Sequence, residues 1–204
     1  MQAPGITINR YCASGLESIA MATAKIRTGM ADCIIAGGTE SMSLVPTAGW
    51  KTVPAYSIAS DEPDYYLNMG LTAEAVAKEY NVSREDQDLF SYNSHLKAGR
   101  AIQEGYFKSG ILPITVEEIY LDEKNKKQIR NFVVDTDEGV RADTSVEGLS
   151  KLKPAFAANG CVTAGNSSQT SDGAAFVMVM SERMIKQTGL KPIARLVSCV
   201  SAGV

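Results

Sequence analysis

The sequence predicts an α/β fold that carries an inserted α+β segment, and three observations lead to this prediction. Residues 5–44 alternate a β-type run, a helical pattern and an apolar run. Residues 161–204 return to the same apolar style, whereas residues 45–160 are more polar. Strands that alternate with helices are typical of layered α/β proteins. We therefore assign 1–44 and 161–204 to one core domain, and 45–160 to a second domain inserted into it.

Composition excludes several classes of protein. The chain has 204 residues, of which 45% are hydrophobic and 21% charged, as in a globular domain. A net charge of −3 argues against nucleic acid as a partner. No apolar run reaches the roughly 18 residues that a membrane span needs, and no signal peptide is evident. One histidine and four scattered cysteines argue against a metal site or a disulfide framework, and favour a reducing compartment such as the cytoplasm.

The first part of the core reads as strand, helix, strand. Residues 6–8 form a short β-type run, and a helical pattern begins near Cys12 and stops at Gly29. The apolar run 33–36 is closed by two glycines at 37–38, which predicts a strand buried on both faces. Together they predict a parallel, right-handed βαβ unit, with Cys12 at the strand-to-helix turn.

The remaining elements follow from helical periodicity, capping residues and turn residues. In the inserted segment we expect helices at 69–80, from a capping box at Ser83 to Gly105, and at 146–152, with a β-hairpin over 115–134. In the last part we expect a strand at 174–180, a helix from Ser181 to Gly189, and another strand over 194–200.

Cys12 has two interpretations. A free cysteine is most often a small buried residue. A helix N-terminus, however, carries partial positive charge and favours the thiolate form. The small neighbours Ala13, Ser14 and Gly15 leave room for a substrate beside the sulfur. The position alone leaves both a structural cysteine and a nucleophile open.

Two further stretches contain glycine and hydroxyl residues beside apolar runs. "TAGNSSQTSDGAAFVMVMS" (163–181) offers backbone N–H groups and hydroxyls before a strand, although an ordinary loop would read the same way. "AGGTESMS" (36–43) follows a buried run, where glycines permit close packing. Neither stretch alone establishes a function.

Together, "NRYCASGLESIAMA" (9–22), "AGGTESMS" and "TAGNSSQTSDGAA" resemble motifs of the thiolase family in their order and separation. The resemblance covers essentially the whole chain and is strongest to the bacterial 3-ketoacyl-CoA thiolases (acetyl-CoA acyltransferases) and acetyl-CoA acetyltransferases. It implies a thiolase-like layered fold in which 45–160 is a loop domain that covers coenzyme A. The implied reaction is acyl transfer through a cysteine thioester between 3-ketoacyl-CoA and CoA, or the reverse Claisen condensation of acetyl-CoA. CoA is then a substrate, no further cofactor is needed, and a homo-oligomer is expected.

The resemblance also implies roles for individual residues. Cys12 matches the cysteine that is acylated, and Met69 in "YLNMGLTAE" matches a methionine beside the reactive thioester. Arg141 in "DEGVRADTS" matches a basic residue beside the adenine nucleotide, and Ala164 and Ser168 match positions that contact the pantetheine arm. Asn68 stands where some relatives carry a histidine.

Three family motifs of the carboxyl-terminal half are missing from this sequence: the "NEAF"-like segment, the "GHP" histidine and the "CxGGG" cysteine. His95 in "SYNSHLKAG" does not match the catalytic histidine, and we expect it to play a structural part. The sequence therefore predicts an internal fragment of a thiolase that lacks turnover by itself. The alternative is a noncatalytic CoA- or lipid-binding module; a ketoacyl synthase fits less well because the loop-domain segment matches.

Overall fold

The computed structural model describes residues 3–46, 49 and 51–202. The chain forms two compact units: Met1–Thr52 with Thr170–Val204, here called the core unit, and Val53–Gln169, here called the inserted unit. These boundaries, at 52/53 and 169/170, lie eight and nine residues beyond the predicted ones at 44/45 and 160/161. That the inserted unit covers coenzyme A stays a prediction.

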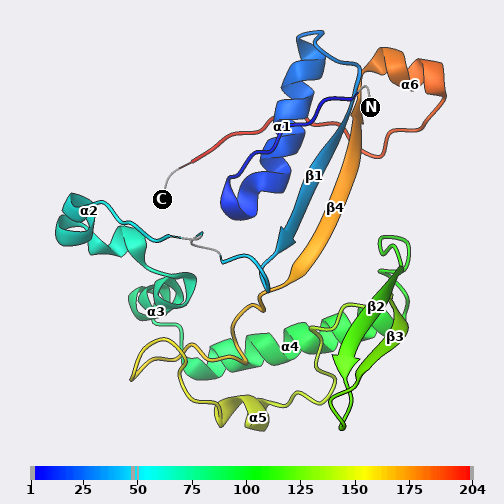
Figure 1. Cartoon of the computed structure of the whole chain (residues 1–204). Helices are drawn as coiled ribbons and strands as arrows, with labels where there is room; N and C mark the ends of the chain where they lie inside the picture. Colours follow the sequence, from blue (N-terminus) through cyan, green and yellow to red (C-terminus); the bar gives the residue numbers. More distant parts are fainter. Residues whose placement is uncertain (1–2, 47–48, 50, 203–204) are drawn as a thin grey trace. The chain divides into compact units, whose positions relative to one another are not determined.

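The core unit consists of a two-stranded antiparallel sheet and its helices (Figure 1). Strand β1 (Cys33–Ser41) pairs with β4 (Asp172–Met180), from Cys33 opposite Met180 to Ser41 opposite Asp172. Helix α1 (Ser14–Arg27) lies along these strands, and the side chains of Ala22 and Ala36 are buried there. Helix α6 (Glu182–Thr188) follows β4, and the Ser181 hydroxyl accepts the Met184 N–H as its cap.

Several predictions for the core are wrong. Segments 6–8 and 194–200 form no strand within the described residues, and β1 pairs with an antiparallel strand instead of completing a parallel βαβ unit. An apolar run becomes a strand only when a neighbouring strand binds its backbone, and the run itself carries no information on that neighbour. The strands are also not buried on both faces, since the Ile35 side chain is 68% exposed.

The two glycines of β1 do not close the strand, which continues to Ser41. Gly37 lies so close to β4 that a Cβ atom there would stand 2.1 Å from the Ala175 carbonyl oxygen. A Cβ at Gly38 would meet open space. Gly37 therefore serves close packing between the paired strands, which was the structural interpretation of this stretch.

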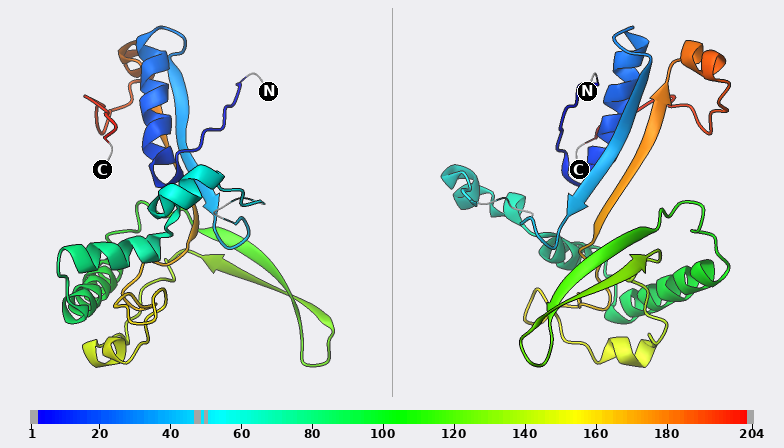
Figure 2. Two further views of the ribbon diagram at one scale, coloured as in Figure 1. Left: turned by 90° about the vertical axis from the view of Figure 1, so that its left-hand side faces the viewer. Right: turned by 45° about the vertical axis from the view of Figure 1, so that its right-hand side comes forward.

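The inserted unit contains the predicted helices and hairpin, together with a helix that the sequence analysis did not predict, α2 (Tyr56–Asp61). Side-chain caps explain where α3, α4 and α5 begin, and in α4 the Ser83 hydroxyl accepts the Asp86 N–H at 3.0 Å. Figure 2 shows the hairpin as a long twisted ribbon. The other elements of this unit are α3 (Met69–Glu79), α4 (Arg84–Gln103), β2 (Ile114–Leu121), β3 (Lys127–Val134) and α5 (Val146–Ser150). Among the helices of the described residues, none has the length and apolar character to cross a membrane.

Candidate active site

Cys12 lies in a short 3₁₀ turn, Tyr11–Ala13, directly before α1. The residue before it, Tyr11, has φ of 47°, which lies in the left-handed region that side chains other than glycine rarely adopt. Such a conformation costs about 1–3 kcal/mol and persists only where neighbouring groups enforce it. Cys12 is exposed in this turn, which argues against the interpretation as a buried structural cysteine, and its part as a nucleophile stays a prediction.

Several short-range hydrogen bonds and one bond to a distant residue hold the Cys12 turn. The Tyr11 N–H donates to Asn9 Oδ1 at 2.8 Å, and the Arg10 N–H donates to Ser14 Oγ at 2.7 Å. The Ser14 hydroxyl in turn donates to the Tyr11 carbonyl at 2.7 Å. The Arg10 guanidinium pairs with Glu17 at 2.5 Å and donates to the Ser201 hydroxyl at 2.7 Å. The turn is therefore held by its own polar neighbours, while the sulfur stays accessible.

The segment 161–168 carries two of the predicted site residues, and a buried polar network shapes it. The Thr163 side chain is fully buried, and its hydroxyl accepts the N–H groups of Gly165 and Asn166 at 3.2 and 3.3 Å. Ala164 and Ser168 are exposed on the same segment. The alternation of buried and exposed positions leaves these two residues available to a ligand.

Glu74 on α3 ties the start of this segment to the helix. Its carboxylate accepts the N–H groups of Cys161 and Val162 at 2.9 Å each, and the Cys161 thiol at 3.3 Å. Burial raises the pKa of this carboxyl, but the hydrogen bonds from Cys161 and Val162 outweigh burial, and the pKa lies below its usual value. The Glu74 carboxyl group is therefore stabilised in its charged form. Its hydrogen bonds fix the position of Cys161, which is half-buried.

Met69 is the first residue of α3 and is exposed, in the same unit as segment 161–168. Asn68, which stands where some relatives have a histidine, is the N-cap of this helix: its Oδ1 accepts the Leu71 N–H at 2.9 Å. Gly70, which follows Met69, packs against the Phe156 ring, where a Cβ would stand 2.2 Å from a ring carbon. Asn68 therefore has a local structural part, and α3 packs against the chain that leads into segment 161–168.

Arg141 lies in the loop after the hairpin, and its backbone N–H donates to His95 Nδ1 on α4 at 3.2 Å. Two residues earlier, Gly139 packs directly on Gln169, because a Cβ there would stand 2.1 Å from the Gln169 Oε1. The loop of Arg141 thus lies beside the end of the segment that carries Ser168. His95 therefore accepts a hydrogen bond from the backbone, which agrees with the structural part predicted for it.

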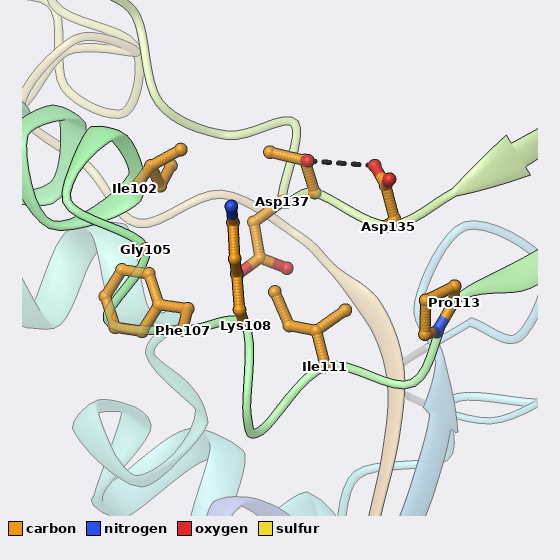
Figure 3. Close-up of a pocket in the computed structure, with 9 residues that line it drawn as sticks. Ile102, Gly105, Phe107, Lys108, Ile111, Pro113, Asp135 and Asp137 are labelled. Atoms are coloured by element: carbon orange, nitrogen blue, oxygen red, sulfur yellow. Dashed lines mark hydrogen bonds between the residues drawn. The ribbon is translucent and has the colours of Figure 1, made fainter.

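The four predicted CoA-binding residues therefore share the inserted unit, whereas Cys12 belongs to the core unit. A separate cavity of about 310 Å³ lies elsewhere in the inserted unit (Figure 3). Apolar side chains such as Phe107 and Ile111 line it together with Lys108 and Asp137. None of the predicted site residues lines this cavity. No cluster of potential metal ligands occurs in the described part of the chain.

The family of this chain is shown by a match to a family model. The model described as "Thiolase, N-terminal domain" matches residues 1–183. The chain belongs to the thiolase family. Its motifs at Cys12, at 36–43 and at 163–175 are therefore thiolase motifs in a thiolase fold.

Thiolases from several organisms match the chain over almost its whole length. A 3-ketoacyl-CoA thiolase from Bacillus subtilis is 51% identical over 201 residues, covering 98% of this chain and 51% of that protein. The beta-ketothiolase BktB from Cupriavidus necator is 43% identical over 216 residues, covering 100% of this chain and 52% of that protein. The chain thus spans about half the length of these relatives.

Solved thiolase structures match the fold as well. The crystal structure of the Bacillus anthracis acetyl-CoA acetyltransferase aligns with a TM-score of 0.71 and 36% identity, over 91% of this chain and 48% of that one. The dimeric peroxisomal thiolase of Saccharomyces cerevisiae aligns with a TM-score of 0.74 and 34% identity, over 90% and 45% of the two chains. The predicted thiolase-like α/β fold is confirmed.

Sequence reasoning missed three features of the site. The left-handed backbone at Tyr11 has no sequence signal, because tyrosine is not a residue that favours it. The bond from Arg141 to His95 joins residues 46 positions apart, so no local pattern could show it. The pairing of Arg84 with Asp88 did have a signal, the i, i+4 spacing of opposite charges on a predicted helix.

Proposed function

We propose that this chain is the nucleophile-bearing half of an acyl-CoA C-acyltransferase in which Cys12 accepts the acyl group. The observation that carries the proposal is the exposed Cys12 thiol at the start of the 14-residue helix α1, behind the left-handed Tyr11 and inside a thiolase motif. The partial positive charge of a helix N-terminus favours the thiolate that such a reaction needs.

In the thiolysis direction, the Cys12 thiolate attacks the C3 carbonyl carbon of a 3-ketoacyl-CoA and forms an S–C bond. The resulting oxyanion collapses, the C2–C3 bond breaks, and its electron pair remains on C2 of the departing acetyl-CoA, which takes up a proton. The sulfur of a second CoA, whose thiol gives up a proton, then attacks the thioester. This step releases the shortened acyl-CoA and regenerates the cysteine. The same steps in reverse condense two acetyl-CoA molecules.

The proposed binding residues contact different parts of the CoA molecule. Ala164 and Ser168 offer exposed positions for the pantetheine arm, and Met69 lies on α3, which packs against the same region. The Arg141 side chain supplies a cation for a phosphate or a stacking surface for adenine. We further propose a cytoplasmic enzyme of fatty-acid metabolism that works as a homo-oligomer. Exposed apolar side chains on the sheet, such as Ile35 and Phe176, support association with another chain.

The test of acyl transfer uses the chain alone and joined in frame to the carboxyl-terminal half of a thiolase relative. We expect no loss of acetoacetyl-CoA absorbance with the chain alone, because its one histidine, His95, is bound to the Arg141 N–H in the inserted unit. We expect turnover from the fusion, loss of that turnover in Cys12→Ala, and little change in the matched Cys33→Ala. A fusion that is folded, binds CoA and is never acylated would support the noncatalytic module instead.

The test of CoA binding uses Arg141→Ala, with Lys124→Ala at the hairpin tip as control. Loss of one charge-assisted contact should weaken CoA binding by about 1–3 kcal/mol in calorimetry. Lys124 lies in the turn between β2 and β3, and its removal should leave the affinity unchanged. Equal affinity of Arg141→Ala and the unaltered chain would remove Arg141 from the proposed site.

A further inference from the structure

Segment 161–168 has no helix or strand of its own, and the backbone bridge that it forms lies at Thr163, opposite Pro154. Side chains therefore determine much of the shape of its remainder. Asn166 makes three of the bonds that do so. Its Nδ2 donates to Asp88 Oδ1 and to the Cys161 carbonyl, both at 3.0 Å, and its Oδ1 accepts the Thr163 N–H at 2.7 Å. One side chain therefore joins both ends of the loop that carries Ala164.

Asp88 anchors Asn166 to the long helix α4. The Asp88 side chain is 2% exposed, and its second oxygen accepts Arg84 Nε at 2.8 Å. Arg84 in turn donates to the carbonyls of Leu149 and Leu152 at 2.7 and 3.0 Å. The chain of bonds thus runs from α5 through α4 to the loop. Because the charge of the buried Asp88 is costly to keep out of water, its bonds to Arg84 and Asn166 have to be kept for the arrangement to persist.

The bonded residues and the exposed residues of this loop have different surroundings. Thr163 and Asn166 direct their polar atoms inward, while Ala164 and Ser168 face solvent. Building on the proposed function, we infer that Asp88 and Asn166 are positioning residues: they hold Ala164 and Ser168 in the orientation that receives the pantetheine arm of CoA. They need not touch CoA themselves.

This role makes a prediction that general destabilisation does not. The adenine nucleotide is assigned to Arg141, which is held by His95 and not by Asn166. A disturbed loop should therefore weaken binding of whole CoA, while binding of adenosine 3′,5′-bisphosphate, which has no pantetheine arm, stays the same. A variant that merely loosens the inserted unit would weaken both.

The experiment measures both ligands by calorimetry on the 204-residue chain and on its variants, each shown by circular dichroism to be folded at the assay temperature. Asn166→Asp removes both donated bonds and sets two carboxylates together, so CoA affinity should fall roughly tenfold. Adding Asp88→Asn to Asn166→Asp exchanges the amide and the carboxylate, so that one position again donates and the other accepts. The net charge returns to its original value. The affinity for CoA should therefore recover in part. Glu104→Gln, which breaks an exposed ion pair at the end of the same helix, serves as the matched control.

The outcomes separate this inference from the proposed function. If the unaltered chain binds neither ligand, the CoA-binding function fails and this inference fails with it. If the chain binds CoA and Asn166→Asp binds it equally well, only the positioning role is overturned. Equal weakening of both ligands, or no recovery in the double variant, also overturns the positioning role and leaves the function standing.

Discussion

The Cys12 turn and segment 161–168 are both irregular stretches with thiolase motifs, yet they are held in different ways. The Cys12 turn uses hydrogen bonds among exposed neighbours, and its backbone is left-handed at Tyr11. Segment 161–168 uses a buried network in which Thr163 and Asp88 are almost without solvent contact. The proposed role of Cys12 as a nucleophile accounts for supports at the surface, because a nucleophile has to be reached by its substrate. A loop that orients a ligand can place its supports inside.

The largest expected effect breaks the buried support. Asp88→Ala leaves the Arg84 guanidinium, which is partly buried, without its carboxylate, and should lower the free energy of unfolding by about 2 kcal/mol. The matched change Glu182→Ala breaks an exposed ion pair with Lys186 and should cost less than about 0.5 kcal/mol. Chemical denaturation of both variants makes the measurement. Similar losses in the two would mean that the Asp88 network contributes no more than a surface pair.

The next effect concerns the two cysteines of these regions. Cys12 is exposed, whereas the Cys161 sulfur is half-buried, donates to Glu74 and accepts a bond from the Gln87 amide at 3.1 Å. Iodoacetamide should therefore label Cys12 first among the four cysteines and at least about tenfold faster than Cys161. Peptide mapping after limited labelling gives the order. Faster labelling of Cys33 or Cys199, both also exposed, would contradict a special reactivity of the turn.

A smaller effect on stability tests whether the backbone of the Cys12 turn is strained at Tyr11. Glycine adopts the left-handed backbone freely, and a β-branched residue does so least readily. Tyr11→Val should therefore be less stable than Tyr11→Gly by about 1 kcal/mol. Thermal unfolding compares the two variants directly, both of which lack the tyrosine ring. Equal stability would show that the turn relaxes away from its positive φ.

The smallest effect is a pH dependence in the inserted unit. The pKa of Glu74 is lowered in the folded chain, so its stabilising contribution is complete above the unfolded-state value and is lost as the pH falls through the folded-state value. Between about pH 6 and 3, the unaltered chain should lose more stability than Glu74→Gln, which has no such titration. Glu79→Gln, an exposed position on the same helix, should follow the unaltered chain. Parallel curves for all three would refute the linkage.

Local signals in the sequence were enough to place most of the inserted unit. Helical periodicity, the capping box at Ser83 and the polar turn at 122–125 predict α3, α4, α5 and the hairpin, and the structure confirms each of them. The three motifs placed the chain in its family, and the family model confirms this. These features depend on residues a few positions apart, and such interactions are present in any stretch of chain that contains them.

Only the tertiary structure decided the partners of distant segments. The run 33–36 looked the same whether its neighbour was parallel or antiparallel, and β4, which pairs with it, lies more than 130 residues further along. Residues 6–8 have strand composition but no strand partner within the described residues. Likewise, Asp88 and Asn166 are 78 residues apart and meet only because α4 and the loop pack together. A backbone or side-chain hydrogen bond needs both of its groups in place, and a sequence pattern describes only one group at a time.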